Sequence, residues 1–250
     1  MKCILLCAGY ATRLFPLTEN FPKALLDIEP GKPLLNYIVE EVNTLDEVDE
    51  IFVISNNCYY QLLADWASAL NNPKPIRVLN DNTNSNEDRL GAIGDIMFTI
   101  EHGNINDDIL VIAGDNLFDY KLRGLLDYYH QVKAPIVACK EVNNIDLLRR
   151  CGVVTIDENN CIIGMVEKPA EPPSNIVAFA TYLYPKKLLP KIKQYLEEGN
   201  KPDAPGHLVE YFYKRMPVYS YLFEGNCYDV GTHEALKEVR QLYCEKKVNQ

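Results

Sequence analysis

The chain has 250 residues, of which 47% are hydrophobic and 24% are charged, and its formal net charge is −10 at pH 7. These proportions are typical of an ordinary soluble globular protein with one sizeable α/β domain or two small ones. The acidic balance argues against a nucleic-acid or anionic-membrane partner, so an anionic ligand must be bound by a few placed cations and backbone amides.

The cysteines and the apolar runs indicate the cellular compartment in which the protein is expected. The eight cysteines form no CxxC pair and fit no common zinc spacing. Three of them, Cys3, Cys7 and Cys139, lie in apolar runs where a free cysteine behaves as a small hydrophobic residue. No run reaches the ~18 apolar residues of a membrane span, and the N-terminal run is too short for a secretory signal. We therefore expect a reduced, cytoplasmic protein.

The first half of the chain alternates short apolar runs with segments of helical periodicity. Strands are predicted at residues 2–6, 50–55, 76–79 and 108–112, and helices at 33–42 and 59–70. Continuous apolar strands separated by helices indicate a parallel sheet covered on both faces. Such sheets bind ligands at the carboxyl ends of their strands, which singles out the loops after Leu6 and Ile112.

The second half has more strands and turns. Strands are predicted at residues 152–156, 161–166, 176–184 and 218–223, and helices at 186–198, 208–215 and 233–244. No Gly-, Ser- or Pro-rich linker divides the chain, so we predict a mixed-sheet extension of one domain over residues 1–250.

The stretch CAGYATRLFP at residues 7–16 follows the first strand and is a candidate phosphate loop. Small residues let the backbone approach a ligand closely, free amides can bind an anion, and Arg13 can bind phosphate through two hydrogen bonds. An ordinary strand-to-helix turn with one exposed arginine looks similar. Lys23, in FPKALL, makes a phosphate clamp more credible because it lies in the same loop.

Acidic residues follow three other predicted strands. Asp115 in AGDN and Asp229 in YDVGTH each stand where a Mg²⁺ ligand is expected, although either alone is more often a cap or turn residue. Glu167 and Lys168, in GMVEKP, form either a surface ion pair or a hydroxyl acceptor beside a phosphate donor. The polar stretch 80–88 is either a surface excursion or a ligand loop.

In this order and spacing, CAGYATRLFP, FPKALL, AGDN, GMVEKP and YDVGTH resemble the sugar-1-phosphate nucleotidylyltransferases, most closely the short glucose-1-phosphate thymidylyltransferases. The resemblance implies a Rossmann-like nucleotidyltransferase fold with a mixed, mostly parallel central sheet flanked by helices. It also implies a nucleotide-binding half at about residues 1–130 and a sugar-phosphate-binding half at about 131–250.

The resemblance further implies roles for individual residues. Arg13, Lys23 and Asp115 would be catalytic, and Asp115 and Asp229 would hold Mg²⁺. Gly152, Glu167 and Lys168 would bind the sugar phosphate. The residues implied for the nucleotide are Ala8, Gly9, Thr12, Arg13, Asn82, Gly91 and Asp115, with Asn82 and Gly91 at the base.

The implied reaction condenses a nucleoside triphosphate, with dTTP or UTP favoured, and a sugar 1-phosphate into an NDP-sugar and pyrophosphate. The oxygen of the sugar phosphate attacks the α-phosphorus in line, so no protein nucleophile is needed and positioning and charge neutralisation carry catalysis. The composition also permits a homo-oligomer.

Three alternatives stay open at this point. One is a cytidylyltransferase that uses CTP and phosphocholine or another small phosphorylated alcohol, with Tyr182, Tyr211 and Tyr228 as a cation-binding cage. A second is a catalytically silent nucleotide-sugar sensor. The third, a glycosyltransferase, would require an Asp-x-Asp motif that residues 115–117 do not supply.

Three positions depart from the family pattern. Ala11 replaces the family's second glycine, and Cys151 and Cys227 replace aromatic residues. We expect Ala11 to have a negative φ, where a methyl group costs little.

Overall fold

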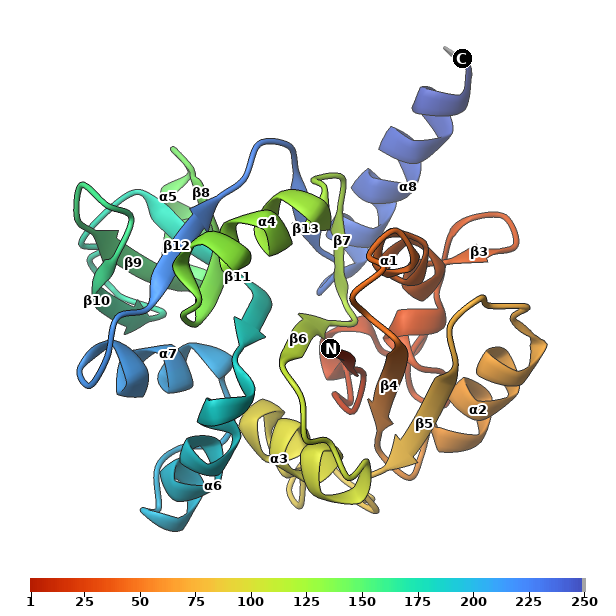
Figure 1. The fold of residues 1–250 in the computed structure, drawn as a ribbon. Helices are drawn as coiled ribbons and strands as arrows, with labels where there is room; N and C mark the ends of the chain where they lie inside the picture. Colours follow the sequence, from red (N-terminus) through yellow and green to blue (C-terminus); the bar gives the residue numbers. More distant parts are fainter. Residues whose placement is uncertain (249–250) are drawn as a thin grey trace.

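A 9-stranded sheet forms the centre of the molecule, with the strand order β10-β9-β11-β6-β1-β4-β5 along its main path. The computed structural model describes the backbone of residues 1–248 and the side chains of residues 1–245. Figure 1 shows the elements from the first strand to the C-terminal helix. The four strands of the first half are parallel neighbours: β1 (Lys2–Leu6), β4 (Glu50–Ser55), β5 (Ile76–Asn80) and β6 (Ile109–Ala113).

The second half continues the same sheet with mostly antiparallel strands. They are β8 (Ile136–Glu141), β9 (Gly152–Ile156), β10 (Ile162–Glu167), β11 (Ile176–Tyr184) and β12 (Tyr219–Leu222). The long strand β11 joins the halves, because it pairs with β6 through residues 181–184 and with β9 through residues 176–178. Its register shifts between these two stretches, after Ala178.

Helices cover both faces of the sheet, because its strands are apolar on both sides. In β1, Cys3 and Leu5 pack in one buried cluster and Ile4 in the other, as the twofold alternation of a strand requires. The first face is covered by α1 (Leu34–Asn43), α2 (Tyr60–Ala69) and α4 (Leu122–Val132). The second is covered by α3 (Ala92–His102), α6 (Leu189–Glu197) and α7 (Pro205–Tyr213). The predicted α/β fold, a mixed central sheet flanked by helices, is confirmed.

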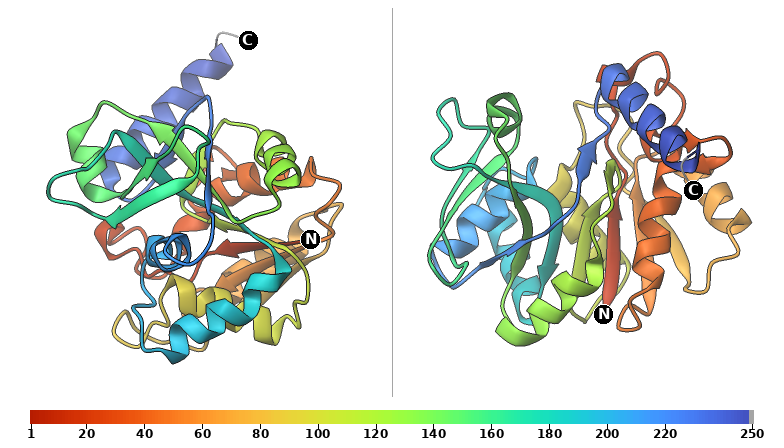
Figure 2. Two further views of the ribbon diagram at one scale, coloured as in Figure 1. Left: turned by 60° about the vertical axis from the view of Figure 1, so that its left-hand side comes forward. Right: turned by 90° about the horizontal axis from the view of Figure 1, so that it is seen from above.

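The C-terminal helix α8 (His233–Val248) returns to the first half of the chain. It packs against the hairpin of β2 (Asp27–Glu29) and β3 (Lys32–Pro33), and Arg240 Nε donates to the Asp27 carbonyl oxygen at 2.8 Å. Figure 2 shows this helix beside the N-terminal segments. The two halves are therefore interleaved in space.

Several elements were not predicted from the sequence. The loop between β1 and α1 contains two 3₁₀ turns, η1 (Thr12–Leu14) and η2 (Lys23–Leu25), besides the β2–β3 hairpin. Helices α3, α4 and α5 (Ile145–Arg150) were not assigned, and α7 begins at Pro205, earlier than expected. A small sheet of β7 (Asn116–Phe118) and β13 (Cys227–Asp229) depends on a pairing between distant segments, which local periodicity does not reveal.

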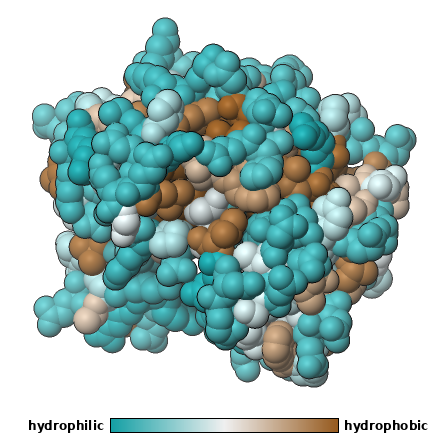
Figure 3. All heavy atoms as spheres, turned by 90° about the horizontal axis from the view of Figure 1, so that it is seen from below, coloured by the Kyte–Doolittle hydropathy of each residue, from teal (hydrophilic) through white to brown (hydrophobic). Residues whose placement is uncertain are grey.

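On the face in Figure 3 most residues are hydrophilic, and hydrophobic residues gather in a recess that crosses it. No helix of the described residues is long and apolar enough to cross a membrane. All eight cysteines are free thiols.

Candidate active site

The loop after β1 presents its backbone to a cavity. Ala8, Gly9 and Thr12 line this cavity together with Arg13. Within residues 1–248, the backbone amides of Gly9, Tyr10 and Ala11 donate to no other protein group. Unpaired amides in a tight turn can bind an anion.

The expectation for Ala11 is wrong. Its φ is 47° and its ψ is 40°, which is the left-handed conformation that L-residues rarely adopt. Two hydrogen bonds to its carbonyl oxygen hold this turn, from Leu14 N at 2.9 Å and from the buried Thr18 hydroxyl at 2.8 Å. The turn that leads into η1 therefore needs positive φ at this position, and alanine carries the strain.

Two carboxylates and a lysine meet at the ends of β6 and β13. Lys23 Nζ lies 2.5 Å from Asp115 Oδ2 and 3.9 Å from Asp229 Oδ1. The β7–β13 pairing brings the two aspartates together, and Val230 N donates to the Asp115 carbonyl oxygen at 3.1 Å. The local sequence could indicate each aspartate as a candidate ligand, but it could not show that the two lie close together.

Glycines let this cluster pack closely. A Cβ at Gly114 would overlap Cys7 Sγ, so the turn carrying Asp115 can lie directly against the end of β1. A Cβ at Gly231 would lie 3.0 Å from Asp229 Oδ1 and 3.1 Å from Arg13 Nη2. Arg13 therefore reaches the same turn as Asp229.

Burial raises the pKa of Asp229, the charge of Asp115 raises it further, and Lys23 and Arg13 oppose the shift. Two neighbouring carboxylates with hard oxygen donors fit a magnesium ion, which would relieve their repulsion. Among the described residues, no group of three His, Cys, Asp or Glu side chains could hold a metal ion. The remaining ligands would therefore have to be phosphate oxygens and water.

A second group of residues comes from β9, β10 and α7. Glu167 pairs in register with Gly152, and burial raises the pKa of its carboxyl group while Lys168 and His207 lower it. A Cβ at Gly152 would lie 3.0 Å from Glu167 Oε2, and one at Gly206 would overlap that oxygen. The two glycines thus make room for Glu167 between β9 and the first turn of α7.

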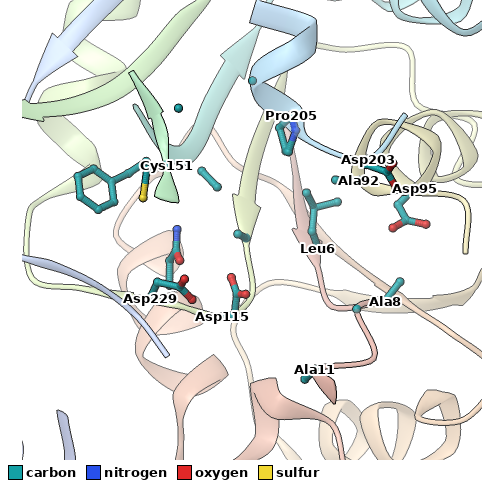
Figure 4. Close-up of a pocket in the computed structure, with 18 of the residues that line it drawn as sticks. Leu6, Ala8, Ala11, Ala92, Asp95, Asp115, Cys151, Asp203, Pro205 and Asp229 are labelled. Atoms are coloured by element: carbon teal, nitrogen blue, oxygen red, sulfur yellow. The ribbon is translucent and has the colours of Figure 1, made fainter. Parts of the chain in front are cut away.

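One cavity of about 560 Å³ joins both groups. Figure 4 shows Asp115 and Asp229 on one side of it and Ala92, Asp95 and Asp203 on the other. The predicted site residues that line it are Ala8, Gly9, Thr12, Arg13, Lys23, Gly91, Asp115, Gly152, Glu167 and Asp229.

Two predicted residues are not part of this lining. Asn82 is exposed at φ 65° in the loop after β5, and Lys168 is exposed at φ 50° directly after β10. Their assigned roles stay predictions. Asn86 and Arg89 line the cavity from the polar loop instead.

Sequence reasoning missed Asp95 and Gly206, which also line the cavity. The signal for Asp95 was a single acid inside the apolar run AIGDIMF, at residues 92–98. Pro205 before Gly206 indicated a helix start, but nothing local showed that this turn meets Glu167.

Residues 2–246 match the nucleotidyl transferase family. The chain is 33% identical to "Bifunctional protein GlmU" of Methanocaldococcus jannaschii, over 98% of this chain and 55% of that protein. It is 35% identical to a "Putative mannose-1-phosphate guanyltransferase" of Sulfolobus acidocaldarius, over 77% of this chain and 50% of that protein. It is 26% identical to "UTP--glucose-1-phosphate uridylyltransferase AglF" of Haloferax volcanii, over 74% of this chain and 72% of that protein.

The chain thus spans about half the length of the first two relatives. The crystal structure of a UDP-glucose pyrophosphorylase complexed with UDP-glucose has the same fold, with a TM-score of 0.83, 24% identity and 98% coverage of both chains. The protein therefore belongs to the nucleotidyl transferase family.

Proposed function

We propose that the protein transfers a nucleotidyl group from UTP or dTTP to a sugar 1-phosphate, giving an NDP-sugar and pyrophosphate. The observation that carries this proposal is the single cavity in which Arg13, Lys23 and Asp115 face the same space as Gly152 and Glu167. A phosphate-binding end joined to a hydroxyl-accepting end fits two phosphorylated substrates that react with each other.

The loop after β1 and the cluster of Lys23, Asp115 and Asp229 have separate roles in the proposed reaction. The free amides of Gly9 and Tyr10, with Arg13, bind and orient the triphosphate, and Lys23 neutralises charge that develops as the sugar-phosphate oxygen attacks the α-phosphorus. The bond from the α-phosphorus to its bridging oxygen then breaks, and pyrophosphate leaves. Asp115 and Asp229 would hold Mg²⁺, which supplies further charge neutralisation at phosphate oxygens.

Glu167 would accept hydrogen bonds from the hydroxyls of the sugar. Gly152 and Gly206 confine its carboxylate at that end of the cavity. We place the reaction in the cytoplasm, because eight free thiols suit a reducing compartment.

The cytidylyltransferase alternative has less support. Of the three tyrosines that would form a cation cage, Tyr182 lines the cavity, whereas Tyr211 and Tyr228 are not among its lining residues. The ring of Tyr211 instead packs against the Arg215 guanidinium at 3.7 Å.

Pyrophosphate release across a substrate matrix tests the proposal. dTTP, UTP, CTP, GTP and ATP are each combined with hexose 1-phosphates and with phosphocholine, in the presence of Mg²⁺. We expect turnover with UTP or dTTP and a hexose 1-phosphate, and its loss in Asp115→Ala. The control is Asp127→Ala, an exposed carboxylate on α4. Turnover of phosphocholine alone, or full activity of Asp115→Ala, contradicts the proposal.

A further inference from the structure

Two buried carboxyl groups meet beside the cavity without a counter-ion. Asp81 follows β5 and is 6% exposed, and Asp95 lies in the first turn of α3 and is 7% exposed. The two side chains hydrogen-bond to each other. In the described part of the chain, Asp81 Oδ2 and Asp95 Oδ1 are fully buried and no other group donates to them. Two carboxylates in this arrangement must share a proton.

The surroundings place that proton on Asp95. Asp81 Oδ1 accepts hydrogen bonds from Thr83 N at 2.7 Å and from Thr83 Oγ1 at 2.8 Å, which stabilise its negative charge. Burial first, and then the charge of Asp81, raise the pKa of Asp95 to about 8. Asp95 is thus a carboxylic acid whose proton faces Asp81.

The other oxygen of Asp95 is free to accept. Asp95 lines the arm of the cavity on which Ala92 and Asp203 also lie, away from Asp115 and Asp229 (Figure 4). The nearest backbone donors in α3 are engaged, since Ala92 N donates to Asp203 O at 3.2 Å and Asp95 N donates to Gly91 O at 2.8 Å. With its proton directed at Asp81, Asp95 itself presents one acceptor to this arm.

We propose that Asp95, held by Asp81, selects the nucleobase by accepting the N3–H of uracil or thymine. The inference rests on the proposed function, because a triphosphate bound at Arg13 and Lys23 leaves this arm for the nucleoside. The pairing edge of uracil and thymine carries one N–H, which one acceptor matches. Guanine carries two adjacent donors, and cytosine and adenine carry a ring nitrogen that needs a donor.

The deciding probe is N3-methyl-UTP, which lacks only the N–H in question. For the wild-type enzyme, we expect methylation to lower kcat/KM by at least about tenfold relative to UTP, since a buried acceptor is left unpaired. Asp95→Ala should lower kcat/KM for UTP toward the value for N3-methyl-UTP and so remove the discrimination. Asp95→Asn should keep the discrimination between UTP and N3-methyl-UTP, because the side-chain amide of the new asparagine can donate to Asp81 as the shared proton does.

The outcomes distinguish failure of the Asp95 role from failure of the proposed function. Equal use of UTP and N3-methyl-UTP by the wild type overturns the role of Asp95 but leaves the transferase intact. Preference for CTP, ATP or GTP over UTP and dTTP overturns both the role of Asp95 and the nucleotide named in the proposed function, but leaves nucleotidyl transfer intact. No turnover of any triphosphate overturns the proposed function itself. If Asp95→Ala does not fold, the wild type and Asp95→Asn still decide, and Asp65→Ala on α2 controls for loss of a remote carboxylate.

Discussion

At the residue scale, the turn at Ala11 shows how the loop after β1 is shaped. A residue at φ 47° costs about 1 kcal/mol or more when it carries a Cβ, and glycine avoids this cost. The loop keeps the conformation because Leu14 N and Thr18 Oγ1 both donate to the Ala11 carbonyl oxygen. The hydrogen bond from the buried Thr18 hydroxyl thus helps to keep Ala11 in its strained conformation.

Replacing Ala11 with glycine should stabilise the protein. Relief of the left-handed strain outweighs the greater freedom of glycine in the unfolded chain, so we expect a gain of about 0.5–1 kcal/mol in the free energy of unfolding. Urea titration measures it. Ala67→Gly, within α2, is the matched control and should destabilise by a similar amount. Destabilisation by both changes would show that the turn does not strain Ala11.

The pH dependence of stability tests the state of Asp95. The pKa of Asp95 is about 8 in the folded protein and 3.8 as a reference value, so the folded state binds this proton more tightly than the unfolded state. The stabilisation that this proton contributes is complete below about pH 4 and is lost as pH rises toward 8. Over that range the free energy of unfolding falls by up to about 1.4 kcal/mol per pH unit.

Asp95→Asn should remove this loss, so the variant should gain stability relative to wild type between pH 5 and 8. Unfolding titrations at several pH values measure the difference, with the exposed Asp46→Asn as control. A constant difference across this range would contradict the assignment of the proton to Asp95.

At the scale of elements, α7 confines the end of the cavity that contains Glu167. Its first turn brings Gly206 against Glu167, and the strands β9 and β10 hold Gly152 opposite the same carboxylate. The position of Glu167 is therefore set by two glycines from separate elements. This arrangement makes Gly206 a positioning residue in the proposed reaction.

Gly206→Ala should displace Glu167, because the new methyl group would overlap its Oε2. We expect KM for the sugar 1-phosphate to rise at least about tenfold while KM for the nucleotide changes little. Initial-rate kinetics with each substrate varied in turn measure the split. Gly164→Ala, on the same strand as Glu167, meets Thr155 at an ordinary 3.4 Å and is the control. An equal rise in both KM values would argue against a specific role.

At the scale of the whole molecule, the sheet gathers residues from both ends of the chain. The loop after β1 supplies Arg13, the turn after β6 supplies Asp115, and the return of the C-terminal segment through β13 supplies Asp229. Because these parts meet only in the folded state, ligands that bridge them should stabilise the entire fold.

Thermal unfolding with and without ligand measures this stabilisation of the fold. With UTP at about one hundred times its Kd, we expect about 2.7 kcal/mol of added stability with Mg²⁺ present, and less after a chelator removes the metal. Asp229→Asn should make the shift nearly independent of Mg²⁺. A shift in the wild type that is identical with and without Mg²⁺ would refute a metal role for Asp115 and Asp229.

The α/β class, the bounds of β1, β4, β9 and β11, and ten of the residues that line the cavity could be predicted from the sequence, because apolar periodicity and short motifs are local signals. Tertiary structure alone decided the β7–β13 pairing, the meeting of Lys23 with two aspartates, the fit of Glu167 between glycines and the Asp81–Asp95 pair. The strain at Ala11 belongs with these, because only the packing around Thr18 reveals it. Contacts between distant segments follow from strand order and burial, and neither is encoded in any single stretch of sequence.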